Sequence, residues 1–124
     1  MKFMDSIGYK DFSDEASISE LIVRVLSAPH DEQIIILDDF GFIAGQKTKF
    51  PFGPDYLASE IAWWIDPESR GENRGLKLMN AFEYWAKNIA NCRFISMTSL
   101  DKNVEKVYKK NGYKLYERAY MKVL

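Results

Sequence analysis

The chain has few of the residues on which several kinds of protein chemistry depend. It contains one cysteine, Cys92, so an internal disulfide is excluded and a reducing compartment is expected. No motif of a cysteine nucleophile surrounds Cys92, and we expect a buried structural thiol. Its one histidine, His30, follows Pro29 in a loop without the partners that a triad or a metal site needs. We therefore expect chemistry without a metal, a histidine base or a cysteine nucleophile.

Neither a strong charge nor a long apolar run marks the sequence. The formal net charge is -1, from 17 basic and 18 acidic side chains, which argues against nucleic acid or an anionic membrane as a partner. No stretch approaches the roughly 20 apolar residues of a membrane-spanning helix. Residues 1–12 lack the continuous apolar segment of a signal peptide. We expect a cytoplasmic protein without a membrane partner, and a homodimer is left open.

The composition is that of a globular protein. Apolar residues make up 47% and charged residues 28% of the 124 residues, which suits a single domain over residues 1–124. Apolar periodicity and turn residues predict, in order, a helix over 17–28, a hairpin of strands 33–37 and 42–47, a loop over 49–54, a strand over 57–65, a helix over 73–90, a strand over 93–99, a helix over 101–111, and a strand pair or one long bent strand over 113–124. This order predicts an α/β or α+β domain with a mixed sheet.

Helix signals support these boundaries. Ser17 and Glu20 have the spacing of a capping box at the start of the first helix. Asp101 is suited to cap the last helix, and Gly112 to end it. The helix over 73–90 has one apolar stripe that would face the core, formed by Leu78, Phe82, Trp85 and Ile89 and widened by Met79 and Ala86.

Residues 70–75 place two arginines and two glycines between an expected strand and an expected helix. A helix N-terminus offers free backbone N–H groups and roughly half a positive charge, so it can hold a phosphate. Gly71 and Gly75 would let a ligand approach the backbone, and Arg70 and Arg74 would add charge. The spacing is neither that of a P-loop nor that of the dinucleotide-binding G-x-G-x-x-G turn. By itself the segment also fits a plain polar turn.

The surrounding sequence, WIDPESRGENRGL over residues 64–76, resembles the acetyl-coenzyme A signature of the GCN5-related N-acetyltransferase (GNAT) family. In that family a strand ends in an apolar residue, any residue and proline, and leads into R/Q-x-x-G-x-G/A at the start of a helix. The matching positions are Ile65, Pro67, Arg70 and Gly75. Asn73 replaces the first glycine of the signature, and asparagine tolerates the left-handed backbone conformation better than most residues.

A second motif follows where the family has it, after the next strand. Residues 104–113, VEKVYKKNGY, resemble the family's A-x-x-l-Y-x-k-x-G-F/Y, and Asp101 stands where the family usually has Asn. The resemblance covers about residues 57–124, whereas the first half has one helix instead of the family's usual two. It implies a GNAT-like fold, with a mixed, mostly antiparallel twisted sheet flanked by helices and with parallel strands 4 and 5 splayed apart to admit pantetheine.

The resemblance implies acetyl-coenzyme A as cosubstrate, with no metal. The residues it places at the coenzyme are Trp64, Ile65, Arg70, Gly71, Glu72, Asn73, Arg74, Gly75 and Leu76 around the turn, and Asp101, Asn103 and Tyr108 in the second motif. The backbone N–H of Trp64 or Ile65 would donate to the thioester carbonyl, because the family strand splays there. Lys102, Lys106, Lys109 and Lys110 fit either a solvated helix face or a contact with the coenzyme's 3′-phosphate.

Two residues are candidates for proton transfer. In the family, a tyrosine at the position of Tyr108 can protonate the departing thiolate, and a phenol with a pKa of about 10 stays protonated at pH 7. Helical spacing alone would instead place Tyr108 in the core. Glu60, within the apolar strand over 57–65, resembles the strand glutamate that some family members use as a general base. Partial burial would raise its pKa, although an alternating strand could equally expose Glu60 to solvent.

The loop over 49–56 leads into the strand of Glu60, so we expect its aromatic residues Phe50, Phe52 and Tyr56 to border the acceptor opening. Asp55 would offer a negative charge to an ammonium group. This rim favours a small amine, an exposed lysine or an N-terminal amine over an aminoglycoside, which would call for more acidic residues.

The resemblance implies direct transfer of acetyl from acetyl-coenzyme A to a primary amine. Two alternatives stay open. One is a non-catalytic, coenzyme A-binding module with this fold, which the departures at Asn73 and Asp101 would allow. The other is a GNAT-like nucleobase-modifying enzyme, against which the slightly negative charge argues.

Overall fold

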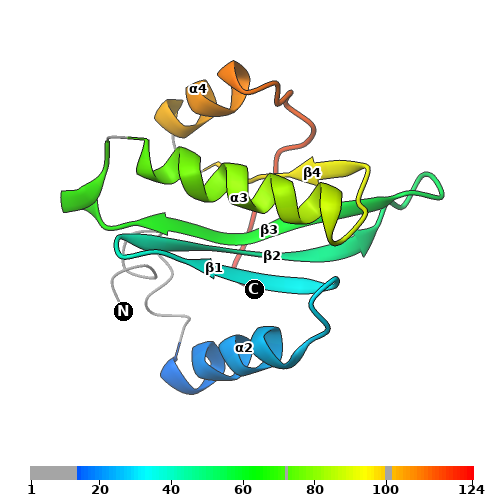
Figure 1. The fold of residues 1–124 in the computed structure, drawn as a ribbon, viewed down its shortest axis with the longest axis horizontal. Coiled ribbons are helices and arrows are strands. Elements are labelled where there is room, and N and C mark those ends of the chain that lie inside the picture. The colour runs from blue at the N-terminus through cyan, green and yellow to red at the C-terminus, as the bar shows by residue number, and fades with distance from the viewer. Residues whose placement is uncertain (1–13, 72, 100–101) are drawn as a thin grey trace.

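The computed structural model describes residues 14–71, 73–99 and 102–124. The elements are α2 (Glu15–Ser27), β1 (Gln33–Leu37), β2 (Gly41–Lys49), β3 (Tyr56–Ile65), the 3-10 turn η2 (Pro67–Ser69), α3 (Arg74–Asn88), β4 (Phe94–Ser96) and α4 (Lys102–Lys110). The strands form one sheet in the order β1-β2-β3-β4 (Figure 1). The β1–β2 and β2–β3 pairs are antiparallel and the β3–β4 pair is parallel. The predicted α/β architecture with a mixed, mostly antiparallel sheet is confirmed.

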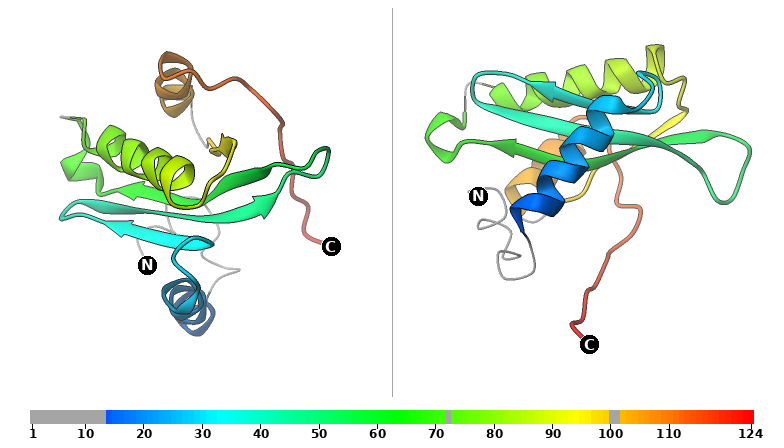
Figure 2. Two further views of the ribbon diagram at one scale, coloured as in Figure 1. Left: turned by 45° about the vertical axis from the view of Figure 1, so that its right-hand side comes forward. Right: turned by 90° about the horizontal axis from the view of Figure 1, so that it is seen from below.

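The core lies between α3 and the sheet. α3 and α4 lie on one side of the sheet and α2 on the other (Figures 1 and 2). Each fully buried large side chain contributes about 1.5–3 kcal/mol by leaving water. The buried residues of this core are Ile43, Ala58, Ile65, Leu78, Phe82, Trp85, Ala86 and Ala90. The stripe predicted for this helix is confirmed except at Ile89, which is 38% exposed because it caps the helix where the chain turns away.

A bulge in β3 decides which of its side chains face α3. Ala44 of β2 lies opposite Ala62, whereas the next residue, Gly45, lies opposite Glu60, so Ile61 is an extra residue in β3. Directly opposed residues point to the same face of a sheet. Glu60 opposite Gly45 therefore shares a face with Trp63 opposite Ile43. Without the bulge, strict alternation would put Glu60 and Trp63 on opposite faces.

β3 and β4 are paired over only part of their length. The parallel ladder joins Leu57–Phe94, Ala58–Ile95 and Ser59–Ser96, and β4 ends there while β3 continues to Ile65. These two strands are the splayed parallel pair that was expected as strands 4 and 5. The opening begins beside Glu60 and extends toward the turn that leads into α3.

Two predicted boundaries were wrong. The first helix begins at Glu15 and is capped by Asp14, not by Ser17. The Asp14 carboxylate accepts two hydrogen bonds from Ser17, one from its backbone N–H at 2.7 Å and one from its hydroxyl at 2.9 Å. Ser17 therefore donates to the capping residue and is not the cap itself. The strand predicted over 93–99 covers only Phe94–Ser96, because the chain leaves the sheet at Met97 on its way to α4.

The strand predicted over 113–124 is not formed. Residues 113–124 have no regular secondary structure, although they follow an expected helix end at Gly112, whose φ is +88°. The exposed residues of this segment include Leu115, Tyr120, Met121 and Val123. Strand propensity therefore does not suffice here, because the ladder of a strand needs a hydrogen-bonded neighbour.

Candidate active site

The turn from β3 into α3 has the backbone that the motif requires. Asn73 is left-handed, with φ 62° and ψ 22°, and directly precedes the helix. Gly71 has φ +102°, and its carbonyl accepts the N–H of Arg74 at 3.2 Å. An asparagine therefore occupies the left-handed position where the family signature has a glycine. This substitution preserves the conformation of the loop.

The helix N-terminus offers backbone donors. The N–H groups of Gly75 and Leu76 lie in the first turn of α3, which has no preceding carbonyls within the helix to accept them. Anions are stabilised at such a position by the dipole and these N–H groups together. The main chain of this turn therefore has the donors with which a helix N-terminus can bind an anionic group.

The two arginines of the turn contact the protein itself. Arg70 Nε donates to the Ile65 carbonyl at 3.0 Å, and its guanidinium lies 4.7 Å from the ring centre of Trp64. Arg74 donates to the Ser69 carbonyl at 2.9 Å and lies 3.6 Å from the ring centre of Phe40. Both side chains thus hold the loop on the end of the sheet. Whether their charges also act on a phosphate, as the sequence predicts, stays a prediction.

The sheet register distinguishes the two candidate backbone donors, Trp64 and Ile65. Asp66 N–H donates to the Phe40 carbonyl at 2.8 Å, so by antiparallel alternation the backbone groups of Trp64 also face β2. Those of Ile65 point to the opposite edge, where its carbonyl accepts Arg70. This is the edge along which β4 has already ended. Of the pair, Ile65 is the one whose N–H faces the opening.

Glu60 is half-buried on β3 where the opening begins. Burial raises the pKa of its carboxyl to about 7, and a hydrogen bond from Thr98 opposes this rise. Thr98 Oγ1 donates to Glu60 Oε2 at 3.0 Å. Glu60 is thus not the fully solvated residue of a simple alternating strand, and near neutral pH its carboxylate can take up a proton.

Tyr108 of α4 is 7% exposed and packs between two other aromatic rings. Its ring stacks on Trp63 at a centroid distance of 5.9 Å and lies 5.5 Å from Tyr113. Its hydroxyl donates to the Thr98 carbonyl at 2.6 Å. Tyr108 is therefore part of the packing, as helical spacing indicated, and its hydroxyl also reaches the segment that bonds Glu60.

The sequence did not reveal Thr98 as part of this site. It lies two residues beyond β4, and it contacts Glu60 through its side chain and Tyr108 through its carbonyl. No motif marks it, because its contacts arise from the separation of β3 and β4. The bulge at Ile61, which brings Glu60 to this face, was also invisible in the sequence.

Trp63 lies between the turn at α3 and Tyr108, because its ring stacks on Tyr108 and lies beside Gly75. Trp63 Nε1 is buried without a hydrogen-bond partner among the described residues, so it is a donor on the face of the sheet that bears Glu60. A Cβ added at Gly75 would lie 3.1 Å from the Trp63 ring, so glycine lets α3 approach this tryptophan.

The aromatic loop lies at the other end of β3. Phe50 contacts Phe94 and Phe52, at centroid distances of 5.0 Å and 5.8 Å. Tyr56 is four residues before Glu60, which corresponds to ~13 Å along a strand. Asp55 forms an ion pair with Arg93 at 3.2 Å, so its charge is already compensated. Only an acceptor that extends along β3 could contact both this loop and Glu60.

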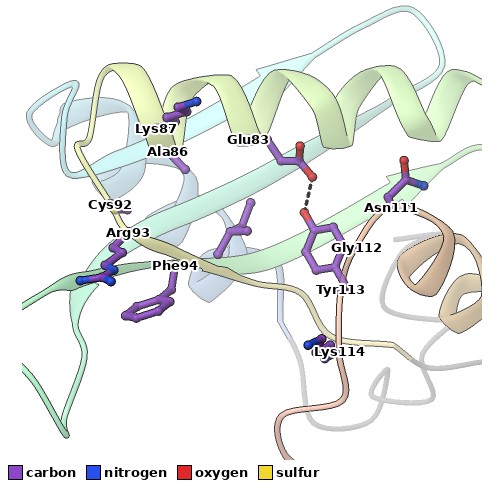
Figure 3. A pocket seen from close by; sticks show the side chains of 11 residues that line it. Glu83, Ala86, Lys87, Cys92, Arg93, Phe94, Asn111, Gly112, Tyr113 and Lys114 are labelled. Atoms are coloured by element: carbon purple, nitrogen blue, oxygen red, sulfur yellow. Dashed lines mark hydrogen bonds between the residues drawn. The ribbon is translucent and has the colours of Figure 1, made fainter.

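A groove of about 590 Å³ lies at the far end of α3 from the turn (Figure 3). Tyr113 donates to Glu83 at 2.6 Å across it, and burial raises the pKa of this phenol. Cys92 lines the groove and is half-buried, so the buried thiol predicted there is only partly confirmed. Glu60, Thr98 and Tyr108 do not line this groove, but Tyr113, which does, lies 5.5 Å from the ring of Tyr108.

For several of the expected site residues, the structure gives no contact that supports a role. Glu72 and Asp101 lie outside the described residues. Asn103 and the four lysines of α4 are exposed, as a solvated helix face requires. Within residues 14–71, 73–99 and 102–124, no group of His, Cys, Asp and Glu could hold a metal ion. No helix in the same ranges is long and apolar enough to cross a membrane.

Comparison with known families agrees with this arrangement. The model of the Acetyltransferase (GNAT) family matches residues 5–113, so the chain belongs to the GNAT family. No curated protein matches its sequence closely enough to count as a relative.

Solved structures show the same fold at low sequence identity. A GNAT family acetyltransferase of Staphylococcus aureus has a TM-score of 0.71 and 20% identity, covering 99% of this chain and 85% of that one. AAC(6')-Iy, solved with the bisubstrate analogue CoA-S-monomethyl-acetylneamine, has a TM-score of 0.68 and 21% identity over 94% and 83%. Glucosamine-6-phosphate N-acetyltransferase of Arabidopsis thaliana has a TM-score of 0.71 and 14% identity, covering 89% of this chain and 78% of that one.

Proposed function

We propose that this protein is an N-acetyltransferase that moves acetyl from acetyl-coenzyme A to a primary amine by direct attack. The observation that carries the proposal is the meeting of Glu60 and Tyr108 at Thr98, beside the point where β3 and β4 part. A candidate proton acceptor and a candidate proton donor thus lie together where the ladder between β3 and β4 ends. Family membership and the phosphate-type turn at α3 support the same reaction.

Each residue has a separate task. Acetyl-coenzyme A supplies the acetyl group as an activated thioester. The N–H groups at the start of α3 hold the pyrophosphate, and the Ile65 N–H donates to the carbonyl oxygen. Glu60 Oε2 takes the proton of the ammonium group, directly or through water, and Tyr108 Oη holds the proton that the leaving sulfur needs. Placement of the amine beside the acyl group supplies much of the remaining rate enhancement.

The acceptor we propose is a small amine, or a lysine or N-terminal amine. The similar structures include an aminoglycoside acetyltransferase complex, which makes a polyamine the second candidate. Against it, two acids are already engaged: Asp55 pairs with Arg93, and Glu83 accepts the hydroxyl of Tyr113.

Calorimetry with acetyl-coenzyme A, followed by a thiol-release assay on a panel of amines, tests the function. We expect binding and amine-dependent thiol release, with kcat/KM falling as pH drops below about 7, where Glu60 becomes protonated. Glu60→Gln should bind acetyl-coenzyme A as the parent does and lose this limb of the profile. Binding without release on every amine would favour the non-catalytic module, and a mobility shift with DNA or RNA would favour the nucleobase-modifying alternative.

A further inference from the structure

Thr98 joins the two candidate proton-transfer residues. Its hydroxyl donates to Glu60 Oε2 at 3.0 Å, and its carbonyl accepts Tyr108 Oη at 2.6 Å. It lies two residues past the end of β4, where the chain has left β3 and turns toward α4. One residue therefore touches the base through its side chain and the acid through its main chain.

We propose that Thr98 is a positioning residue, which fixes the carboxylate of Glu60 relative to the hydroxyl of Tyr108 for acyl transfer. This inference rests on the proposed function. The Tyr108 ring is already held by Trp63 and Tyr113, at 5.9 Å and 5.5 Å, so the Thr98 carbonyl has only to direct its hydroxyl. The Glu60 side chain has more rotatable bonds than that of Tyr108, and the Thr98 hydroxyl selects one orientation of its carboxylate.

The surroundings of Glu60 make this hydroxyl important. Gly45 lies opposite it on β2, and the ring of Phe82 from α3 packs close over Gly45. Tyr108, from α4, is the titratable group that faces it across Thr98. Burial raises the pKa of Glu60, and the Thr98 hydrogen bond is what lowers it. Loss of the hydroxyl would therefore both release the carboxylate and disfavour its charged form.

Thr98→Val and Thr98→Ser test the proposal as a matched pair. Valine keeps the shape of the side chain and the main-chain carbonyl but removes the hydroxyl. Serine keeps the hydroxyl and the main-chain carbonyl and loses only the methyl group. We expect Thr98→Val to lower kcat roughly 10- to 100-fold, the loss of one hydrogen bond to a charged group. In Thr98→Val, the KM for acetyl-coenzyme A should stay unchanged and the acidic limb of the pH profile should move to higher pH. Thr98→Ser should have the kcat and the pH profile of the parent. An unchanged pH profile in Thr98→Val, or a serine variant as slow as valine, would overturn the proposal.

A carbon-13 NMR titration of the Glu60 carboxyl gives a readout that needs no turnover, with Glu60→Gln used to assign the signal. The pKa of Glu60 should be higher in Thr98→Val than in the parent and in Thr98→Ser. Equal values in all three would overturn the role of Thr98 even if the parent is active. Absence of acetyl transfer by the parent on every amine would instead overturn the proposed function, and the catalytic role of Thr98 with it.

Discussion

The two halves of β3 have similar apolar sequences but different neighbours. Residues 57–59 are paired with β2 on one edge and with β4 on the other. Residues 60–65 keep the β2 partner, while β4 has ended, so the backbone of Ile65 faces an open edge. Glu60 and the Ile65 N–H lie on the open half, and Thr98 and Tyr108 lie beside it. Where both edges of β3 are paired, its backbone groups are used within the sheet. Where one edge is open, its backbone groups are available to a ligand.

The contrast predicts that the largest losses come from side chains at the open half. Tyr108→Phe removes only the hydroxyl, so the aromatic packing with Trp63 should persist and the affinity for acetyl-coenzyme A should be unchanged. Turnover should fall roughly 10²- to 10⁴-fold, the usual contribution of a general acid. Steady-state thiol release measures this. As the paired-half control, Ser59→Ala, which loses a weak 3.5 Å contact with Ser96, should change turnover little.

A smaller effect is expected at the left-handed residue of the turn. Asn73→Val should weaken coenzyme A binding roughly 10-fold, because a left-handed conformation costs a residue with a Cβ about 1–2 kcal/mol and more if it is β-branched. Asn73→Gly should bind at least as tightly as the parent, since glycine adopts this conformation without strain. Calorimetry on both variants measures the difference. Equal weakening in the two would show that the Asn73 side chain, and not its backbone, matters.

A third prediction concerns stability and follows from the burial of Glu60. The folded-state pKa of about 7 lies above the ordinary value of 4.5, so the folded protein binds more protons between these values. The contribution of Glu60 to stability is therefore present at low pH and is lost as pH rises toward 7. Glu60→Gln should lack this dependence, and at pH 8 it should be more stable than the parent although less active.

Urea unfolding at pH 5, 6, 7 and 8 measures this effect. The difference in unfolding free energy between Glu60→Gln and the parent should grow in favour of the variant with pH. A difference that does not vary with pH would show that Glu60 is as well solvated in the folded as in the unfolded chain.

The smallest effect is expected at the paired end of β3. Phe50→Ala with Phe52→Ala should leave coenzyme A affinity and the KM for a short amine within about 2-fold, because the loop lies ~13 Å along the strand from Glu60. The KM for a peptide amine should rise if the acceptor extends along β3. Increased KM for a short amine would place the acceptor opening at the loop, as the sequence alone suggested.

The sequence predicted most elements because each has a local signal. The strand over 33–37 was predicted to the residue, and the left-handed Asn73 was anticipated from its place in the motif. The two strand errors have a common cause. β4 is shorter than its sequence suggested, and residues 113–124 form no strand, because strand formation depends on a partner rather than on propensity.

The site was predictable only where a motif carried it. Motifs in the sequence marked Glu60, Tyr108 and the turn as candidates, but they did not predict how these residues lie relative to one another. The bulge at Ile61 and the contacts of Thr98 depend on the register of β2 against β3 and on where β4 ends. Neither leaves a periodic signal in the chain. Whether the aromatic loop borders the acceptor stays a prediction, because its nearness to Glu60 in sequence still leaves ~13 Å of strand between them.

The groove beside the second half of α3 contains a natural site for chemical labelling. Cys92, the one cysteine of the sequence, lines this groove, and burial raises the pKa of its thiol. The thiolate is the form that attacks a thiol reagent, so labelling of the folded protein should be slow and confined to one place. The rate of labelling would follow the opening of this end of the molecule, without any engineered substitution.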